Sequence, residues 1–521
     1  MFRRSIRASL RSFRPSLRRA ASTAPRSART VPWAGLALSA GGILDSAQNT
    51  PKGISYDEVQ RHKSKDSCWV ILNGEVYDVT TFLPNHPGGT SSILAVAGTD
   101  ASRIFAPIHH PGVLKTLPPE CHLGPVDLST VPASTLSPEE EADEKRIAAQ
   151  RALLPPAESF LLLSDFEEWA HKVLPRAAWA YYASAADSES AYTENIASWS
   201  RYFFRPRVLR KIDEGDLKTT VCGTEMDMPV FICPAAMARL GHPLGELNLT
   251  RAAASHGIVQ AISINASCPL DEILEAREEG QKVWFQIYLN KDRERSVELL
   301  KKVEQEGVAA VIFTVDVAWQ SKRTLDRRAK TALEPPPSNV GSAKGEQGAG
   351  VAAAISGYQD THLVWDDIDF IRGLQSVPDL ILASEHPAVS GVIISNHGGR
   401  SADYAPAPID VLTELRWYAP ETFDKVDVMI DGGVRSGADV VKALALGAKA
   451  VGLGRPFLYA NGTHGQAGAE RVCEILEEEI TNTMRNCGAA TIDQLTPSLV
   501  GPYGPWVGGN KPKWYHPCDT K

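Results

Sequence analysis

The sequence predicts a small α+β module followed by a parallel α/β unit that closes into a (β/α)8 barrel. Short apolar runs alternate with amphipathic helical patterns over more than 250 residues, and polar side chains follow the ends of these runs. Such alternation requires a parallel sheet with helical connections, and at this length a barrel is the best candidate. The first module is indicated by a hairpin pattern followed by two histidines.

Length and composition limit the number of domains and the kinds of site that the chain can contain. The chain has 521 residues, enough for two or more domains, with a net charge of −8 and a hydrophobic fraction of 43%. This balance is ordinary for a globular protein, and we expect no nucleic-acid partner. The eight cysteines contain no Cys-x-x-Cys pair. Neither a zinc site nor a disulfide framework is therefore indicated, and any haem must be held without thioether links.

Residues 1–50 have the composition of a targeting segment. The first 30 residues contain nine arginines and no acidic residue, which is typical of a mitochondrial presequence. The apolar stretch 31–44 that follows is too short for a secure membrane span. A basic leader before an apolar stretch predicts delivery to the mitochondrion, with the intermembrane space as the expected destination.

The first folded module is expected at 51–128. Residues 68–79 alternate like a β-hairpin, and Asn73-Gly74 supplies its tight turn. His86 follows in a Pro- and Gly-rich turn, and His109 comes 23 residues later. Two imidazoles that face one another across a pocket can ligate a haem iron from both sides.

A linker is expected at 129–160, with an exposed charged helix over 139–151. The second module is expected at 161–495, before a Pro-, Gly- and Trp-rich tail at 496–521 that is predicted to form an extended arm. Its predicted strands are 230–234, 259–263, 283–289, 310–316, 391–397, 426–432 and 450–455. Helical patterns occupy 270–279, 292–305 and 437–446, while the Pro-, Gly- and Ala-rich stretch 331–360 is predicted to be a loop.

The predicted strand at 391–397 ends in two residues that can carry out acid–base chemistry and bind an anion. His397 can move a proton near neutral pH, and Arg400 can hold a carboxylate with two hydrogen bonds. Such a pair suits the oxidation of a small hydroxy acid. Glycine-rich turns with arginine at 431–435 and 454–455 follow two late strands, where barrels bind phosphate.

The first module resembles the cytochrome b5 family. The matching pieces are Cys68-Trp-Val, Tyr77-Asp-Val, Phe82-Leu-Pro-Asn-His-Pro-Gly-Gly and Ala97-Gly-Thr-Asp. The resemblance implies haem b held non-covalently by His86 and His109, with His110 as the nearest rival for the second position.

The second module resembles the FMN-dependent α-hydroxy acid oxidoreductases over about 330 residues. The motifs are Ala180-Tyr-Tyr-Ala-Ser, Phe285-Gln-Ile-Tyr, Thr314-Val-Asp, Ser395-Asn-His-Gly-Gly-Arg, Asp431-Gly-Gly-Val-Arg and Gly454-Arg-Pro. The resemblance implies catalytic roles for the following six residues. His397 takes a proton, Asp316 stabilises the protonated imidazole, Tyr288 bonds the substrate hydroxyl, and Arg400, Tyr181 and Arg323 serve the carboxylate.

The same resemblance implies an FMN site. The ring would lie against Ala235 and Ala236 and contact Ser263, Gln286 and Thr314. The ribityl chain and phosphate would be held by Asp431, Gly432, Gly433, Val434, Arg435, Gly454 and Arg455.

Both modules in this order resemble the haem-linked branch of the family. The implied reaction is oxidation of L-lactate, or a close 2-hydroxy acid, with electrons passed through haem to cytochrome c, and the implied assembly is a homotetramer. Two alternatives remain: an oxidase that passes electrons to oxygen, and a haem electron carrier attached to an inactive flavin barrel.

One element of the barrel is missing from the sequence. Between the helix expected at 365–375 and the strand that starts at Gly391, only residues 376–390 are available, and 379–386 resembles the family's fifth helix. A strand and a crossover do not both fit in this length. The family's fifth strand ends in a lysine beside the flavin, yet no lysine lies between Lys344 and Lys425.

Three explanations fit the gap: a mispredicted exon boundary, which we favour, a splice form, or a divergent protein that lost the strand. We expect a barrel without its fifth strand to be destabilised, with impaired flavin binding or turnover.

Overall fold

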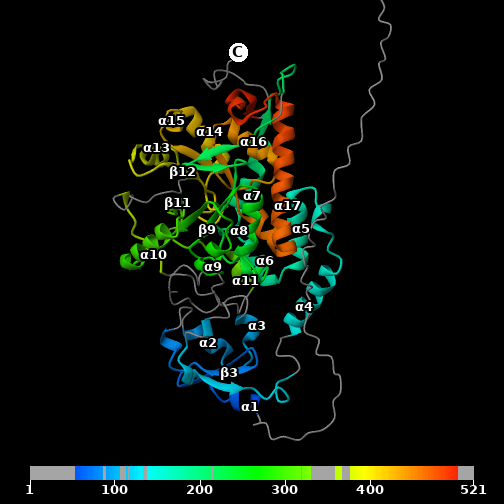
Figure 1. Cartoon of the computed structure of the whole chain (residues 1–521), viewed down its shortest axis with the longest axis vertical. Coiled ribbons are helices and arrows are strands. Elements are labelled where there is room, and N and C mark those ends of the chain that lie inside the picture. The colour runs from blue at the N-terminus through cyan, green and yellow to red at the C-terminus, as the bar shows by residue number, and fades with distance from the viewer. Residues whose placement is uncertain are drawn as a thin grey trace, which may run out of the picture. The chain divides into compact units, whose positions relative to one another are not determined.

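A computed structural model describes residues 53–85, 90–105, 113–114, 117–132, 138–212, 215–317, 319–329, 358–365 and 376–502 (Figure 1). The predicted targeting segment and both predicted haem ligands lie outside these residues. Within them, no helix combines the length and the apolar character that crossing a membrane requires.

The N-terminal module is built on a four-stranded antiparallel sheet. Its strands are β1 (Lys63–Ser64), β2 (Ser67–Leu72), β3 (Glu75–Asp78) and β4 (His122–Pro125), in that spatial order. Its helices are α1 (Tyr56–Val59), α2 (Thr90–Val96) and α3 (Ser102–Phe105). The predicted hairpin is confirmed as β2–β3, and its turn places Asn73 and Gly74 at φ of 55° and 83°. Asparagine and glycine tolerate this left-handed backbone, which matches the twist of the two strands.

The charged run of the linker forms a helix, as predicted. α4 (Pro138–Arg151) buries none of its residues. Two arginines nevertheless fix it to the second module: Arg146 donates to the carbonyl oxygen of Leu174 (2.7 Å) and Arg151 to that of Gly462 (2.9 Å). The helix is therefore solvated but anchored.

The second module contains a curled parallel sheet, which confirms the predicted fold class. Its spatial order is β11-β10-β9-β8-β14-β13-β12. The strands are β8 (Val230–Ile232), β9 (Val259–Ser263), β10 (Val283–Ile287), β11 (Ala310–Phe313), β12 (Gly391–Ile394), β13 (Asp427–Ile430) and β14 (Ala450–Leu453). Each begins within one residue of its predicted start. Most end two or three residues early, because the polar residues that follow belong to the site.

The missing strand is confirmed for the described residues. A closed barrel would pair β11 with a fifth strand and that strand with β12, yet β11 and β12 are the two edges of the observed sheet. The segment predicted as the fifth helix is present as α13 (Val377–Glu385), directly before β12. The sheet is thus a barrel with one opening in its wall.

Helices precede, connect and follow the strands of the sheet. In chain order these are α5 (Leu163–Val173), α6 (Arg176–Ala183), α7 (Ser190–Ser198), α8 (Glu246–Ser255), α9 (Leu270–Glu275), α10 (Arg293–Gln305), α11 (Thr324–Arg328), α13, α14 (Pro408–Tyr418), α15 (Thr422–Lys425), α16 (Gly437–Ala445) and α17 (Arg455–Cys487). The long α17 packs along α5, as Figure 1 shows in orange and cyan. A short strand after it, β15 (Val500–Pro502), pairs with β5 (Tyr202–Phe204).

The interior of the sheet is closed at one end only. A hairpin of β6 (Thr219–Val221) and β7 (Thr224–Met226) places Val221 and Met226 in a buried cluster with Phe231 and Trp284. Trp284 also donates from Nε1 to the hydroxyl of Thr224 (3.2 Å). This plug seals the amino ends of the strands and leaves the carboxyl ends for a site.

Candidate active site

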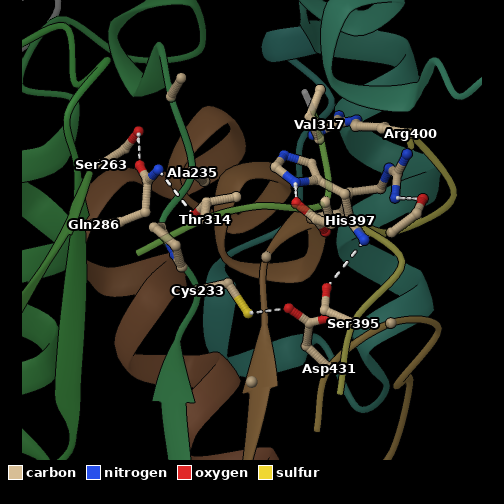
Figure 2. Close-up of a pocket in the computed structure, with 18 of the residues that line it drawn as sticks. Cys233, Ala235, Ser263, Gln286, Thr314, Val317, Ser395, His397, Arg400 and Asp431 are labelled. Carbon is tan, nitrogen blue, oxygen red and sulfur yellow. Dashed lines mark hydrogen bonds and ion pairs between the residues drawn. The ribbon is translucent and has the colours of Figure 1, made fainter. Parts of the chain in front are cut away.

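The carboxyl ends of the strands line one cavity. Every residue predicted for catalysis or flavin binding contributes to its lining: Tyr181, Ala235, Ala236, Ser263, Gln286, Tyr288, Thr314, Asp316, Arg323, His397, Arg400, Asp431, Gly432, Gly433, Val434, Arg435, Gly454 and Arg455. Figure 2 shows Ser263 and Gln286 on one side of the pocket, with His397 and Arg400 on the other.

His397 is held by a carboxylate from a different strand end. Its Nδ1 lies 3.1 Å from Oδ1 of Asp316, whose side chain is only 2% exposed. The backbone turns sharply here, because His397, Gly398 and Gly399 all have φ between 58° and 79°. Since a carboxylate can only accept, Nδ1 carries the shared proton and Nε2 is left as the basic nitrogen.

Three arginines converge on the carboxyl end of α6. Arg323 donates to the carbonyl oxygen of Tyr181 (2.5 Å), and both Arg400 (2.5 Å) and Arg455 (2.9 Å) donate to that of Tyr182. These carbonyl groups are the unpaired acceptors that every helix leaves at its end, and they carry partial negative charge. They hold the guanidinium groups in place without neutralising them.

The cluster therefore concentrates positive charge in a buried place. Burial, followed by the nearby charge of Arg323, lowers the pKa of Arg400 to about 10. Burial and the charge of Arg400 lower the pKa of Arg455 to about 10 as well. Both groups stay charged at neutral pH, so the cavity attracts carboxylate and phosphate anions.

Two tyrosines stand between this cluster and the opposite wall. Burial raises the pKa of Tyr288 well above its usual value, and the charge of Asp316 raises it further. Burial also raises the pKa of Tyr181, against the opposing charges of Arg323 and Arg400. Both phenols keep their protons at neutral pH and can donate a hydrogen bond to a bound oxygen.

The wall opposite His397 offers amide and hydroxyl groups. Gln286 donates from Nε2 to the hydroxyl of Thr314 (3.0 Å), and its Oε1 accepts from the hydroxyl of Ser263 (3.2 Å). The chain leaves β8 through Ala235 and Ala236, whose small side chains line the same cavity. A flat ring with polar edges, such as the FMN ring system, fits between these groups.

Asp431 offers an acceptor to a group with hydroxyls. Its carboxyl is buried and its Oδ1 has no hydrogen-bond partner among the described residues. Burial, partly offset by a hydrogen bond from Ser395, raises its pKa to about 6. A buried carboxylate without full hydrogen bonding is costly, and ribityl hydroxyls would supply the missing donors.

The turn after Asp431 admits only glycine. Gly432 and Gly433 have φ of 91° and 77°, and a Cβ on Gly433 would lie 1.9 Å from the carbonyl oxygen of Asn195. Val434 and Arg435 continue this turn along the cavity. Gly454 precedes α17 at the next strand end and lines the cavity with Arg455, so the amino end of this helix lies at the place expected for phosphate. These features fit FMN.

Two apolar side chains line the cavity at the edges of the sheet. Ile312 of β11 and Ile393 of β12 flank the opening in the barrel wall, and both line the cavity. Among the described residues that line it there is no lysine. The positive charge that the family places beside the flavin is therefore not replaced from these strands.

The N-terminal module contains an apolar cluster close in sequence to the predicted haem ligands. His86 and His109 lie outside the described residues. The apolar side chains near them in sequence gather in one cluster, which includes Leu83, Ile93, Phe105, Leu114 and Leu117. Such a cluster fits the apolar faces of a porphyrin.

The structure adds cavity residues that the sequence did not single out. Cys233, Asn265, Gln359 and Ser395 all line the site. Ser395 and Asn265 lie within two residues of predicted strand ends, which was the available signal. Gln359 lies within the long loop predicted at 331–360, and no pattern in the sequence connects it to the site.

Comparisons with known proteins agree with this geometry. Residues 170–502 match the FMN-dependent dehydrogenase family, and residues 55–127 match the cytochrome b5-like heme/steroid binding domain. The L-lactate dehydrogenase (cytochrome) of Wickerhamomyces anomalus is 41% identical over 457 residues, which is 85% of this chain and 78% of that protein. Human 2-hydroxyacid oxidase 1 is 36% identical over 365 residues, covering 65% of this chain and 96% of that protein.

A solved structure shows the same architecture. The flavin-binding domain of baker's yeast flavocytochrome b2 matches with a TM-score of 0.63 and 38% identity, covering 70% of this chain and 91% of that one. Its fold is the TIM barrel that the curled sheet of this chain follows. The chain therefore belongs to the FMN-dependent dehydrogenase family and joins that domain to an N-terminal cytochrome b5-like domain.

Proposed function

We propose that this protein oxidises L-lactate, or a 2-hydroxy acid close to it, to the 2-oxo acid and delivers the electrons through its haem module to cytochrome c. The observation that carries the proposal is the His397–Asp316 pair, at 3.1 Å, in the same cavity as Arg400 and Tyr288. A relative that aligns with 85% of this chain is named an L-lactate dehydrogenase (cytochrome).

Oxidation of a 2-hydroxy acid removes two electrons and two protons, one from the hydroxyl and one from Cα. His397 accepts one of these protons at Nε2, because Asp316 holds the Nδ1 proton on the far side of the ring. The buried carboxylate of Asp316 also stabilises the imidazolium that results. FMN, held by the residues described above, would supply the two-electron acceptor and would take up the other proton.

The guanidinium cluster orients the acid. Arg400 uses Nε and Nη2 for carbonyl oxygens of the α6 end, and Nη1 makes no hydrogen bond to the described residues. A substrate carboxylate can therefore bind at this nitrogen, with Tyr181 beside it. Tyr288 donates to the substrate hydroxyl oxygen, since its raised pKa keeps the phenol protonated.

An inactive barrel is the rival that one observation favours, namely the opening between β11 and β12. An oxidase is less well supported, because an oxidase needs no haem relay, and the human oxidase aligns with 65% of this chain only. The basic composition of residues 1–30 supports location in the mitochondrial intermembrane space. A homotetramer is proposed on the family resemblance alone.

Haem absorption tests the function directly. The full chain, loaded with FMN and haem, is mixed anaerobically with L-lactate, and a His397→Gln variant is the control. We expect lactate to reduce the haem of the parent protein but not that of the variant, while dithionite reduces both. Haem that dithionite reduces but lactate leaves oxidised would overturn the proposal and support the inactive barrel.

A further inference from the structure

One wall of the substrate end of the cavity is polar where a methyl group would need an apolar surface. Asn265 lies two residues beyond β9, is 4% exposed and lines the cavity. Its backbone N–H donates to the hydroxyl of Ser263 (3.2 Å), which ties it to the strand end. An amide in this position is costly unless it finds hydrogen-bond partners.

The side chain of Asn265 is held by a tyrosine from another part of the chain. The buried Tyr358 donates from its hydroxyl to Oδ1 of Asn265 (3.0 Å). This hydroxyl fixes the amide of Asn265, and Gln359, the residue after Tyr358, lines the same cavity.

Backbone hydrogen bonds secure this second segment. Lys291 donates to the carbonyl oxygen of Tyr358 (3.1 Å), and Asp360 donates to that of Leu289 (2.8 Å). The segment is thereby paired with the chain just after β10, next to Tyr288. Backbone hydrogen bonds therefore hold the polar wall to the same strand end that carries Tyr288.

The contacts leave donors available. Oδ1 of Asn265 is used by Tyr358, whereas its Nδ2 makes no hydrogen bond within the described part of the chain. Both N–H groups of this nitrogen can serve a ligand. An apolar ligand group placed here would remove water from these N–H groups without accepting a hydrogen bond from them, which is unfavourable.

The position of the polar wall relative to Arg400 decides which part of a substrate contacts the wall. Asn265 and Gln359 line the same cavity as Tyr288, and Gln359 pairs with Asn290, two residues after Tyr288. An acid with its carboxylate at Arg400 and its hydroxyl between His397 and Tyr288 directs its remaining substituent, the group on C3, away from Arg400.

We infer that Asn265 and Gln359 form a polar subsite for the C3 group of the substrate, which selects 2-hydroxy acids with a hydroxyl on C3 over those with an apolar chain. The inference rests on the proposed function, since it assumes a 2-hydroxy acid held by Arg400. Asn265 is a specificity-determining residue in this view, and Tyr358 is a positioning residue.

An isosteric pair of substrates tests the inference. L-glycerate and L-2-hydroxybutyrate differ only in a hydroxyl that replaces a methyl group. We expect the parent protein to show a kcat/KM about tenfold higher for L-glycerate. Asn265→Leu, which keeps the size of the side chain, should bring this ratio to about one or reverse it. Tyr358→Phe should lower the ratio in the same direction but less.

Turnover of L-lactate and bound FMN in each variant show whether the fold is retained. A second measurement does not need turnover: calorimetric binding of hydroxypyruvate and 2-oxobutyrate, the two products, to the oxidised protein. The parent should bind hydroxypyruvate more tightly, and Asn265→Leu should lose that preference. Retained lactate turnover with an unchanged ratio in Asn265→Leu overturns the subsite alone. A protein that neither binds nor oxidises any of these acids overturns both the subsite and the proposed function.

Discussion

Arg400 and Arg455 donate hydrogen bonds to the same carbonyl oxygen, that of Tyr182, at 2.5 Å and 2.9 Å. Two buried cations thus share one helix end; the charge of Arg400 lowers the pKa of Arg455, and that of Arg323 lowers the pKa of Arg400. Like charges this close repel unless an anion lies between or beside them. The site therefore holds its charge ready for a carboxylate and a phosphate before either arrives.

Replacing Arg400 with lysine should remove substrate binding without removing the charge. Lysine is a point charge and cannot reach the carbonyl oxygens of Tyr182 and Ser184 while also binding a carboxylate. We expect kcat/KM for L-lactate to fall about 100-fold, which corresponds to about 2.7 kcal/mol.

Arg277→Lys is the matched control, because Arg277 also caps carbonyl oxygens, those of Leu274 and Glu306, but does not line the cavity. Steady-state kinetics on both variants decide the matter. Equal losses in the two variants would contradict a specific role for Arg400.

Asp316→Asn tests the histidine pair. The amide keeps the shape of the side chain but removes the charge that faces the imidazolium. It can also turn its NH2 toward Nδ1 and favour the wrong tautomer of His397. We expect kcat to fall by about 100-fold or more while FMN content stays the same.

Asp227→Asn makes the same chemical change at a side chain that is 64% exposed, and it should leave kcat unaltered. The rate of haem reduction after anaerobic rapid mixing with lactate is measured for the Asp316→Asn and the Asp227→Asn variants. If Asp316→Asn reduced its haem as fast as the parent, Asp316 would not support the proton transfer.

Asp431 links cofactor binding to pH. Burial raises its pKa from 3.8 to about 6 in the folded chain without cofactor. Between these two values the folded protein holds a proton that the unfolded chain has lost, so stability falls as the pH rises through this window. Above it the cost is about 3 kcal/mol, from about two pKa units at 1.36 kcal/mol each.

Asp431→Asn should abolish this slope, raise the Tm of the FMN-free protein at pH 7, and weaken FMN binding about tenfold through the lost acceptor. Thermal unfolding at several pH values and fluorescence titration with FMN measure the two effects. A variant that binds FMN as tightly as the parent would show that Asp431 does not contact the cofactor.

The strands of the barrel could be predicted from the sequence, because each buried strand is a short apolar run and can be recognised without knowing which strand it pairs with. The sequence also revealed the missing strand, since fifteen residues between 376 and 390 could not hold a strand and a helix. The guanidinium cluster could not be foreseen, because its acceptors are backbone carbonyl oxygens at the end of α6, which carry no side-chain signal. The polar wall was missed for a related reason: Tyr358 reaches Asn265 across 93 positions of sequence.

The opening in the barrel should be visible in hydrogen exchange. β11 and β12 each have one neighbour in the sheet, whereas β9 has two. Amides of β11 and β12 that point into the opening have no strand among the described residues to accept their hydrogen bonds, and solvent can exchange them without global unfolding. We expect them to exchange at least roughly 100-fold faster than the amides of β9.

The measurement is peptide-resolved exchange followed by mass spectrometry on the FMN-loaded protein, with the peptide that covers Val259–Ser263 as the internal reference. Equal protection of Gly391–Ile394 and Val259–Ser263 would contradict the opening, because it would require a further segment of the chain to pair with β12. Faster exchange would mean that the flavin must bind to a barrel in which no backbone hydrogen bonds join β11 to β12, although Ile312 and Ile393 belong to the same buried cluster.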